Sequence, residues 1–148
     1  MSKPIKNILV IRLSAMGDVA MIVPVLREFE KQFPKVKVTV LTRPFFAPFF
    51  RDLSNVSIFE ADVKGKHKGL KGLLRLSSEL HKKTKFDAVV DLHGLLRSRI
   101  VTGYFRAKGI QTVTFDKGRS EKKEVLKYFM LLPKKEELYV WIKKLSKP

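Results

Sequence analysis

The first chemically capable group in the sequence is the carboxylate of Asp18, which follows a short turn after the apolar run Ile8–Ile11. A carboxylate at a helix start accepts backbone N–H groups and complements the helix dipole, so the pattern alone favours capping. A carboxylate at the carboxyl edge of a parallel sheet also lies where α/β folds bind ligands, where it can act as a general base. Gly17 lets a ligand approach the backbone closely, which favours the second interpretation. Both remain open.

A second candidate follows another apolar run, Phe86–Leu92. Asp91 lies near the end of this run and His93 directly follows it, and both are expected at the same sheet edge as Asp18, since strand ends of a parallel sheet lie together. Arg97 and Arg99 come soon after, and a planar guanidinium suits a phosphate or carboxylate. In the alternative interpretation, Asp91 and Arg97 simply pair with each other.

The third candidate is a basic run that alternates lysine with glycine and histidine: Lys64, Lys66 and Lys68 are its first three lysines. Its glycines predict a mobile, solvated loop, and the functional alternative is a lid that gathers anions. Lysine attracts anions as a point charge without geometric specificity. Arg119, which follows the last predicted strand, would add to the same rim.

Several other chemistries are not supported by the sequence. The turn that begins at Arg12 has one glycine where a dinucleotide-binding fingerprint needs three, and no Gly-Lys-Ser/Thr phosphate loop occurs. The chain has no cysteine, and its three histidines lack metal-ligand spacing with carboxylates. We therefore expect no metal site and no cofactor.

Short apolar runs alternate with amphipathic stretches, which predicts an α/β, Rossmann-like parallel sheet with flanking helices. The predicted strands are Asn7–Arg12, Lys37–Leu41, Ser57–Phe59, Phe86–Leu92 and Gln111–Phe115, and the predicted helices are Val19–Gln32, Leu70–Lys83 and Leu95–Ala107. The aromatic segment Arg43–Phe50 is expected to plug the sheet edge as a short helix or loop, or to form an apolar wall beside a ligand cleft. Residues 1–120 are expected to form one domain, followed by a helical tail over 121–148.

The chain of 148 residues carries a formal net charge of +17, which favours anionic partners such as a phosphorylated ligand, an acidic membrane surface or nucleic acid. The sequence contains no apolar run near the roughly 18–20 residues of a membrane span, and its start lacks the apolar centre of a signal peptide. A cytoplasmic location is therefore expected, with contact at the inner face of a bacterial inner membrane as a further expectation.

Two motifs carry a resemblance to a known family. They are Ile11-Arg12-Leu13-Ser14-Ala15-Met16-Gly17-Asp18-Val19 with Val23-Pro24, and the stretch from Phe86 to Arg99. Together with parts of the intervening chain, these motifs resemble the amino-terminal half of the lipopolysaccharide heptosyltransferases, glycosyltransferase family 9. The resemblance covers about the first 120 residues, and the tail departs from it.

The resemblance implies a GT-B enzyme with two Rossmann-like domains, of which this chain would supply the acceptor side. Asp18 is then the expected base for an inverting transfer from ADP-heptose, supported by the turn residues Ser14, Met16, Gly17, Asp91 and His93. The residues expected to bind the anionic glycolipid acceptor are Lys64, Lys66, Lys68, Arg97 and Arg119. A donor-binding domain is absent from these 148 residues, so the chain is expected to be truncated relative to the family, to be inactive alone and to meet ADP-heptose only with a partner domain.

A second function class stays open. The chain would then be a non-catalytic basic module for an anionic membrane surface or nucleic acid, with nucleic acid the less favoured partner. Such a module predicts an affinity that falls steeply with salt and does not depend on Asp18.

Overall fold

The computed structural model describes residues 5–114. The predictions for Phe115, for Arg119 and for the helical tail over 121–148 fall outside the described residues. The remaining predicted strands and helices are all present, with bounds that differ by at most three residues.

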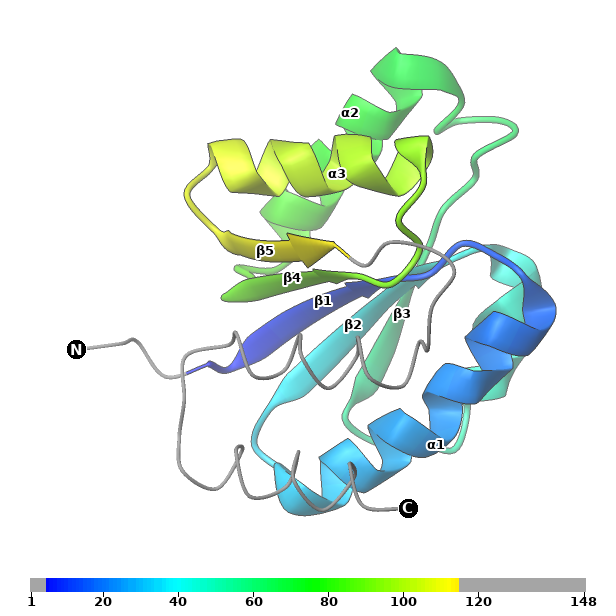
Figure 1. Cartoon of the computed structure of the whole chain (residues 1–148), viewed down its shortest axis with the longest axis vertical. Coiled ribbons are helices and arrows are strands. Elements are labelled where there is room, and N and C mark those ends of the chain that lie inside the picture. The colour runs from blue at the N-terminus through cyan, green and yellow to red at the C-terminus, as the bar shows by residue number, and fades with distance from the viewer. Residues whose placement is uncertain (1–4, 115–148) are drawn as a thin grey trace.

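The described part of the chain forms one parallel sheet of five strands in the order β3-β2-β1-β4-β5 (Figure 1). The strands are β1 (Asn7–Ile11), β2 (Lys37–Thr42), β3 (Val56–Glu60), β4 (Ala88–Asp91) and β5 (Gln111–Thr114). The chain winds outward from β1 to β3 and then returns to place β4 on the other side of β1. This reversal puts the topological switch point between β1 and β4, where α/β folds bind ligands at the carboxyl ends of the strands.

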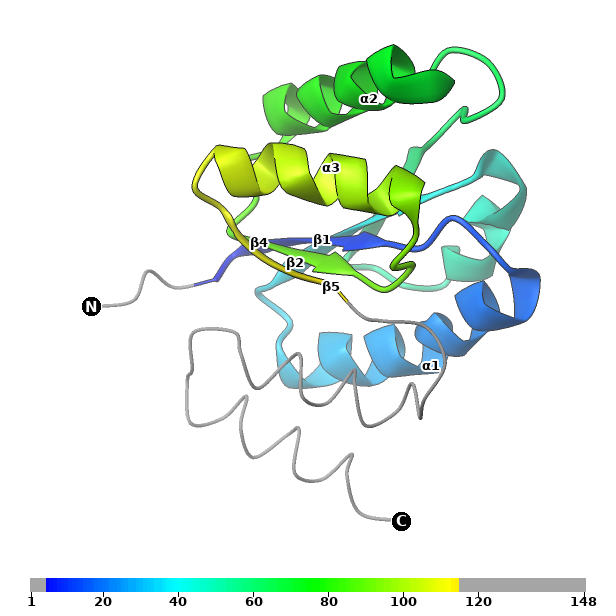
Figure 2. The same ribbon diagram turned by 45° about the horizontal axis from the view of Figure 1, so that its top comes forward.

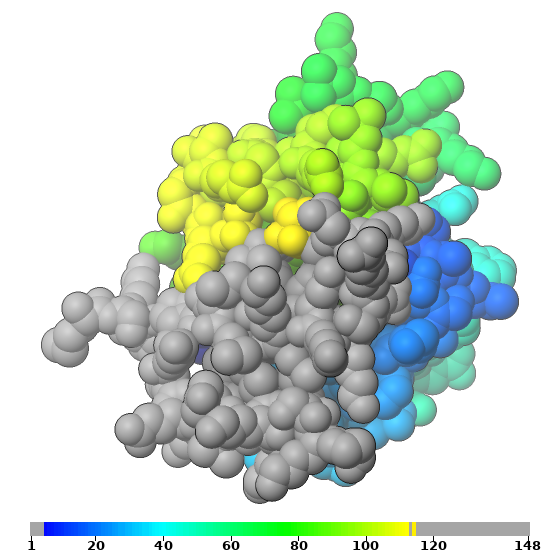
Figure 3. Space-filling view, viewed as in Figure 1, coloured from blue at the N-terminus to red at the C-terminus, as the bar shows by residue number. Residues whose placement is uncertain are grey.

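Helices cover both faces of the sheet. Figure 2 shows α1 (Met16–Gln32) on one face and α2 (Gly69–Lys83) with α3 (Leu96–Ala107) on the other. In the space-filling view, the yellow-green atoms of α3 adjoin the green atoms of α2 at the top, and the blue atoms of α1 lie at the right (Figure 3). The chain is therefore doubly wound, as the near-continuous apolar strands predict.

The alternation of side chains along β1 explains the two cores. Ile8 and Val10 face α1 and pack with Leu26 and Phe29, whereas Leu9 and Ile11 face the opposite layer. In that second core they meet residues of α2 and α3: Leu73, Leu76, Leu80, Val101 and Phe105. Because both faces of the strand are covered, apolar residues are needed at every position.

The aromatic segment forms a short 3-10 helix, η1 (Pro44–Phe50). Phe46 and Phe50 are buried in the α1-side core, and the predicted short helix is confirmed. Phe45 differs from them, because its side chain is 72% exposed. No helix within residues 5–114 is long and apolar enough to span a membrane.

Candidate functional site

Asp18 pairs with an arginine and does not cap a helix. Helix α1 begins at Met16, three residues before the predicted start, and its N-cap is Ala15, which makes no side-chain capping bond. The capping interpretation of Asp18 is therefore wrong: the residue lies in the first turn, where its charge still suits the helix dipole. Its Oδ2 lies 2.5 Å from Nη2 of Arg12, and its side chain is 35% exposed.

Arg12 links the two turns at the switch point. It directly follows β1, is buried with 5% exposure, and donates a hydrogen bond from Nη1 to the carbonyl of Leu92, just beyond β4. One guanidinium thus joins the β1–α1 turn to the β4–α3 turn. The sequence analysis did not predict this role of Arg12. A charged residue at the end of an otherwise apolar strand could have indicated it, because a buried charge needs partners.

Asp91 is a structural residue of the β4–α3 turn. Its carboxylate is fully buried, and Oδ1 accepts the N–H groups of His93 and Gly94, each at 2.9 Å. The hydroxyl of Thr102 donates to Oδ2 at 3.3 Å. The expected Asp91–Arg97 pair is wrong, because the backbone of the turn and Thr102 occupy this carboxylate while Arg97 is exposed.

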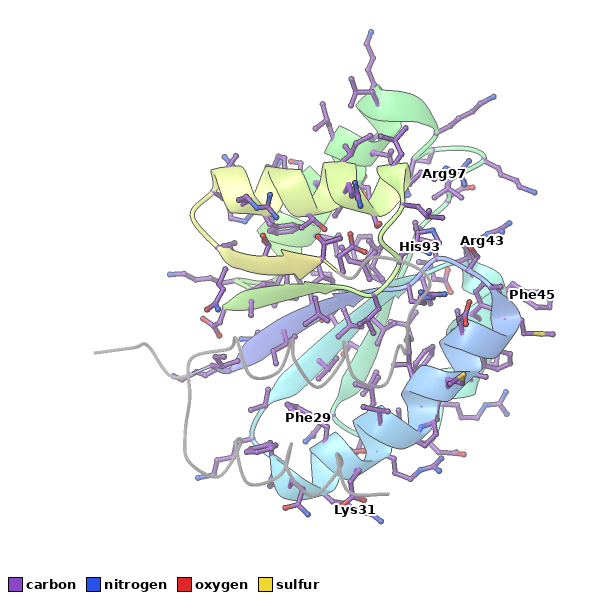
Figure 4. The ribbon with its side chains drawn as sticks, viewed as in Figure 1. Phe29, Lys31, Arg43, Phe45, His93 and Arg97 are labelled. Atoms are coloured by element: carbon purple, nitrogen blue, oxygen red, sulfur yellow. The ribbon has the colours of Figure 1, made fainter. Side chains whose placement is uncertain are left out.

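Arg97 is the second residue of α3 and makes no ion pair within the described residues. Figure 4 shows Arg97 and His93 on the side of the molecule where the strands end, the side that also carries Arg43 and Phe45. His93 is 4% exposed, so of this pair only Arg97 can meet a ligand from solvent. Ser98 fixes the start of the helix, since its hydroxyl accepts from the N–H of Leu95 and donates to the Leu95 carbonyl.

The basic run forms a hydrogen-bonded turn whose lysines are exposed to solvent. The backbone carbonyl of Asp62 accepts hydrogen bonds from the N–H groups of Gly65 and His67 at 3.2 and 2.8 Å. The side-chain Oδ2 of Asp62 accepts a hydrogen bond from the N–H of Lys66 at 3.1 Å. Lys64 and Lys68 are exposed and without an ion pair within the described residues. Lys66 is engaged by Glu79, with Nζ 3.0 Å from Oε1.

Buried His67 ties this turn to α2. Its Nδ1 accepts the backbone N–H of Asp62 at 3.0 Å, and an N–H can only donate, so the ring proton lies on Nε2. Nε2 then donates to Oε2 of Glu79 at 3.1 Å. The hydrogen bond from Lys66, aided by that from His67, lowers the pKa of the Glu79 carboxyl from its ordinary value more than burial raises it. This network attaches the backbone of the turn that carries Lys64 and Lys68 to α2.

The carboxyl edge therefore presents a partly exposed carboxylate, Asp18, held by Arg12, and the exposed Arg97 lies in the turn after the neighbouring strand. Oδ2 of Asp18 faces Arg12, whereas Oδ1 makes no hydrogen bond to the described residues. Ser14 is half-buried, and Met16 and Gly17 are exposed in the same turn. A Cβ atom at Gly17 would meet nothing within 4 Å, which leaves this backbone open to a ligand. No cluster of three potential metal ligands occurs within residues 5–114.

Comparisons with known proteins give a consistent result. No protein-family model matches the chain. The chain is 27% identical over 103 residues to the lipopolysaccharide core heptosyltransferase OpsX of Haemophilus influenzae, covering 70% of this chain and 28% of that protein. A family 9 glycosyltransferase from Veillonella parvula superposes with a TM-score of 0.67 at 19% identity, covering 99% of this chain and 43% of the other.

An Escherichia coli heptosyltransferase, WaaC, solved with ADP, superposes with a TM-score of 0.59 at 20% identity, over 96% of this chain and 49% of that one. The α/β Rossmann-like class and the resemblance to heptosyltransferases are confirmed. The chain spans less than a third of the curated relative and less than half of these two solved chains.

Proposed function

We propose that this chain, which resembles the lipopolysaccharide heptosyltransferases of glycosyltransferase family 9, supplies the acceptor-binding half of an inverting glycosyltransferase of lipopolysaccharide core synthesis. The observation that carries the proposal is the Arg12–Asp18 pair at the switch point of the sheet. It presents a partly exposed carboxylate at the edge where such folds bind ligands. The proposal is supported by the names of the similar proteins, which are a lipopolysaccharide core heptosyltransferase, a family 9 glycosyltransferase and a heptosyltransferase solved with ADP.

In the proposed reaction, Asp18 takes the proton of an acceptor hydroxyl as that oxygen attacks the anomeric carbon of ADP-heptose. The new glycosidic bond forms as the bond to ADP breaks, so configuration inverts and one base suffices. The hydrogen-bonding role of Arg12 leaves Oδ1 of Asp18 for the substrate.

Acceptor binding is assigned to the exposed cations at the same edge. Lys64, Lys68 and Arg97 are unpaired within the described residues and match an anionic, phosphorylated glycolipid. Lys66 contributes less, because Glu79 already neutralises its charge. ADP-heptose would be held by a second, donor-binding domain, so transfer by these 148 residues alone is not expected. A cytoplasmic site of action follows from these proposed substrates.

The test is an NMR titration of the chain, at moderate salt, with a phosphorylated inner-core oligosaccharide and separately with ADP-heptose. We expect saturable shifts from the oligosaccharide around Asp18, Arg97 and the basic turn, and little response to ADP-heptose. Lys64→Ser with Arg97→Ser should weaken binding, whereas the control Lys31→Ser, an exposed lysine at the far end of α1, should not.

The absence of a saturable shift with the oligosaccharide would overturn the acceptor role. The second function class, a basic module without catalysis, predicts instead an affinity for any polyanion that falls steeply with salt. It also predicts the same loss of binding free energy per charge removed for Lys31→Ser as for the double edge variant, because only total charge would then matter.

A further inference from the structure

The carboxylate of Asp91 is buried without a cation beside it. It lies at the end of β4, is fully buried and makes no ion pair within residues 5–114. Hydrogen bonds compensate for the burial of this charge: Oδ1 accepts the N–H groups of His93 and Gly94, and Oδ2 accepts the hydroxyl of Thr102. The three donors belong to the β4–α3 turn and to α3. Asp91 therefore fixes the shape of this turn.

The same turn is attached to the end of β1 through Leu92. The N–H of Leu92 donates to the carbonyl of Ile11 at 3.0 Å, which continues the pairing of β4 with β1 beyond Asp91. The carbonyl of Leu92 accepts a hydrogen bond from Nη1 of Arg12. Figure 1 shows the turn between β4 and α3 lying against the end of β1. The direction of the Leu92 carbonyl therefore depends on the shape of the turn.

Arg12 carries this constraint across the switch point to Asp18. Its guanidinium is planar, so its two Nη atoms move together: one donates to the Leu92 carbonyl, and the other lies 2.5 Å from Oδ2 of Asp18. Arg12 is 5% exposed, and its Nε has no hydrogen-bond partner among the described residues. Loss of the Leu92 contact would therefore leave Asp18 as the remaining partner of this guanidinium in residues 5–114.

We infer that Asp91 is a positioning residue for Asp18, acting through the shape of the β4–α3 turn and through Arg12. This role rests on the proposed function, in which Asp18 is the base. A base raises the rate only when its oxygen lies within hydrogen-bond reach of the proton that it removes. A change in the turn should therefore lower the rate of transfer more than it weakens acceptor binding. A purely structural Asp91 would stabilise the fold without setting the position of Arg12.

Asp87 provides a matched control at the other end of the same two strands. It directly precedes β4, and its Oδ2 accepts the N–H groups of Lys6 and Asn7 at 2.8 and 2.9 Å. Asp87→Ala therefore removes two hydrogen bonds from backbone N–H groups to a carboxylate, as Asp91→Ala does. It removes them at the opposite end of β1 from Arg12.

The first measurement follows the side chain of Arg12 by NMR in the 148-residue chain, with Arg12→Lys to assign its signals. A guanidinium that is held at both Nη atoms rotates slowly about its Nε–Cζ bond and gives separate Nη proton signals. We expect separate signals in the wild type and in Asp87→Ala, and averaged signals in Asp91→Ala. Asp91→Asn should restore the separate signals, because its amide oxygen still accepts the N–H groups of the turn.

Gly94→Ala changes the same turn without altering the carboxylate of Asp91. Gly94 has a φ of +65°, which an L side chain rarely adopts, so alanine strains the turn at this position. This variant should also average the Arg12 signals, and it decides the question if Asp91→Ala does not fold. Separate Arg12 signals that persist when the turn is changed would overturn the positioning role.

The second measurement is the rate of transfer in an enzyme completed with a donor-binding domain. Asp91→Ala should lower kcat by about 10–100-fold with little change in acceptor KM, because misplacing a catalytic group by about 1 Å can cost about 10²-fold. Asp91→Asn should recover most of this loss, and Asp87→Ala should leave both constants unchanged below its unfolding temperature. Equal losses in the two alanine variants would overturn the positioning role.

Asp18→Asn in the same enzyme separates failure of this role from failure of the proposed function. Full activity of Asp18→Asn would overturn the proposed base, and with it a catalytic role for Asp91. An impaired Asp18→Asn beside an unimpaired Asp91→Ala would leave the base in place and overturn only the positioning role.

Discussion

Nη2 of Arg12 lies 2.5 Å from Oδ2 of Asp18, and the same guanidinium donates from Nη1 to the carbonyl of Leu92. Arg12 is buried and Asp18 is only partly so, which makes the arginine the fixed member of the pair. Asp18 lies in the first turn of α1, and its carboxylate is held at the switch point by Arg12. The effects of this pair on catalysis and on the free energy of unfolding can be measured separately.

Replacing the proposed base should affect turnover more than binding. In an enzyme completed with a donor-binding domain, Asp18→Asn should lower kcat by about 10²–10⁴-fold, the usual contribution of a positioned base, with little change in KM for the acceptor. Asp52→Asn makes the same chemical change at an exposed position of the segment after η1 and should leave both constants unchanged. Equal losses in kcat and acceptor affinity would remove Asp18 from the role of base.

The pair itself should be visible in the free energy of unfolding. Arg12→Gln should destabilise the chain by about 1–3 kcal/mol, because a charge-assisted hydrogen bond to the Leu92 carbonyl is lost. Asp18→Asn should cost less, since its side chain is a third exposed and solvent screens the pair.

Urea unfolding of the two single variants and the double variant measures their coupling. We expect about 1 kcal/mol, within the range found for residues in contact. Additive effects would mean that Arg12 acts only through Leu92 and that Asp18 is held by something else.

The decrease in the free energy of unfolding at acidic pH should depend in part on Glu79. The hydrogen bonds from Lys66 and His67 lower the pKa of this carboxyl from its ordinary value of 4.5. A carboxyl with a lowered pKa in the folded state stabilises the protein above its unfolded pKa and loses that contribution as pH falls through the folded value. Glu79→Gln should therefore cost about 0.5–1 kcal/mol at neutral pH and nothing at strongly acidic pH.

Urea unfolding at a series of pH values from neutral to acidic measures this difference. Glu60→Gln is the matched control, because this exposed glutamate at the end of β3 makes no side-chain hydrogen bond or ion pair within the described residues. A gap between wild type and Glu79→Gln that does not narrow on acidification would show that the Glu79 network contributes through packing and not through its charge.

Much of the fold follows from the sequence, because apolar runs covered on both faces and amphipathic helices leave few other arrangements. The runs that contain Leu9 and Val89 are predictable for this reason. The site is less predictable. The positions of Asp18 and Asp91 after two strands predict that both lie at one sheet edge, but they do not predict which residues each carboxylate contacts. Asp91 is fully buried by its own turn, and Asp18 is held by Arg12, a contact between side chains that only the folded backbone brings together.

The basic turn shows the same limit. Lysines and glycines predict a solvated loop, and the buried contacts of His67 with Asp62 and Glu79 depend on where α2 lies. Gly72 packs against this turn, because the backbone of His67 lies directly beside its Cα atom. The sequence around Gly72 does not predict this contact.

Two glycine-to-alanine variants should therefore change stability in opposite directions. A Cβ atom at Gly72 in α2 would lie 2.3 Å from the carbonyl carbon of His67, so Gly72→Ala must displace the basic turn and should destabilise the chain by about 2–3 kcal/mol. Gly103 in α3 has nothing within 4 Å of its Cβ position, and Gly103→Ala should stabilise the chain by about 0.5–1 kcal/mol through helix propensity.

Thermal and urea unfolding of the two variants decide this prediction, and amide exchange locates its cause. Faster exchange of the His67 and Lys66 amides in Gly72→Ala, with unchanged exchange in β1, would place the damage in the turn. A stabilised Gly72→Ala would mean that α2 can move away from the turn at little cost. The close packing of Gly72 against His67 would then not be what holds Lys64 and Lys68 in position.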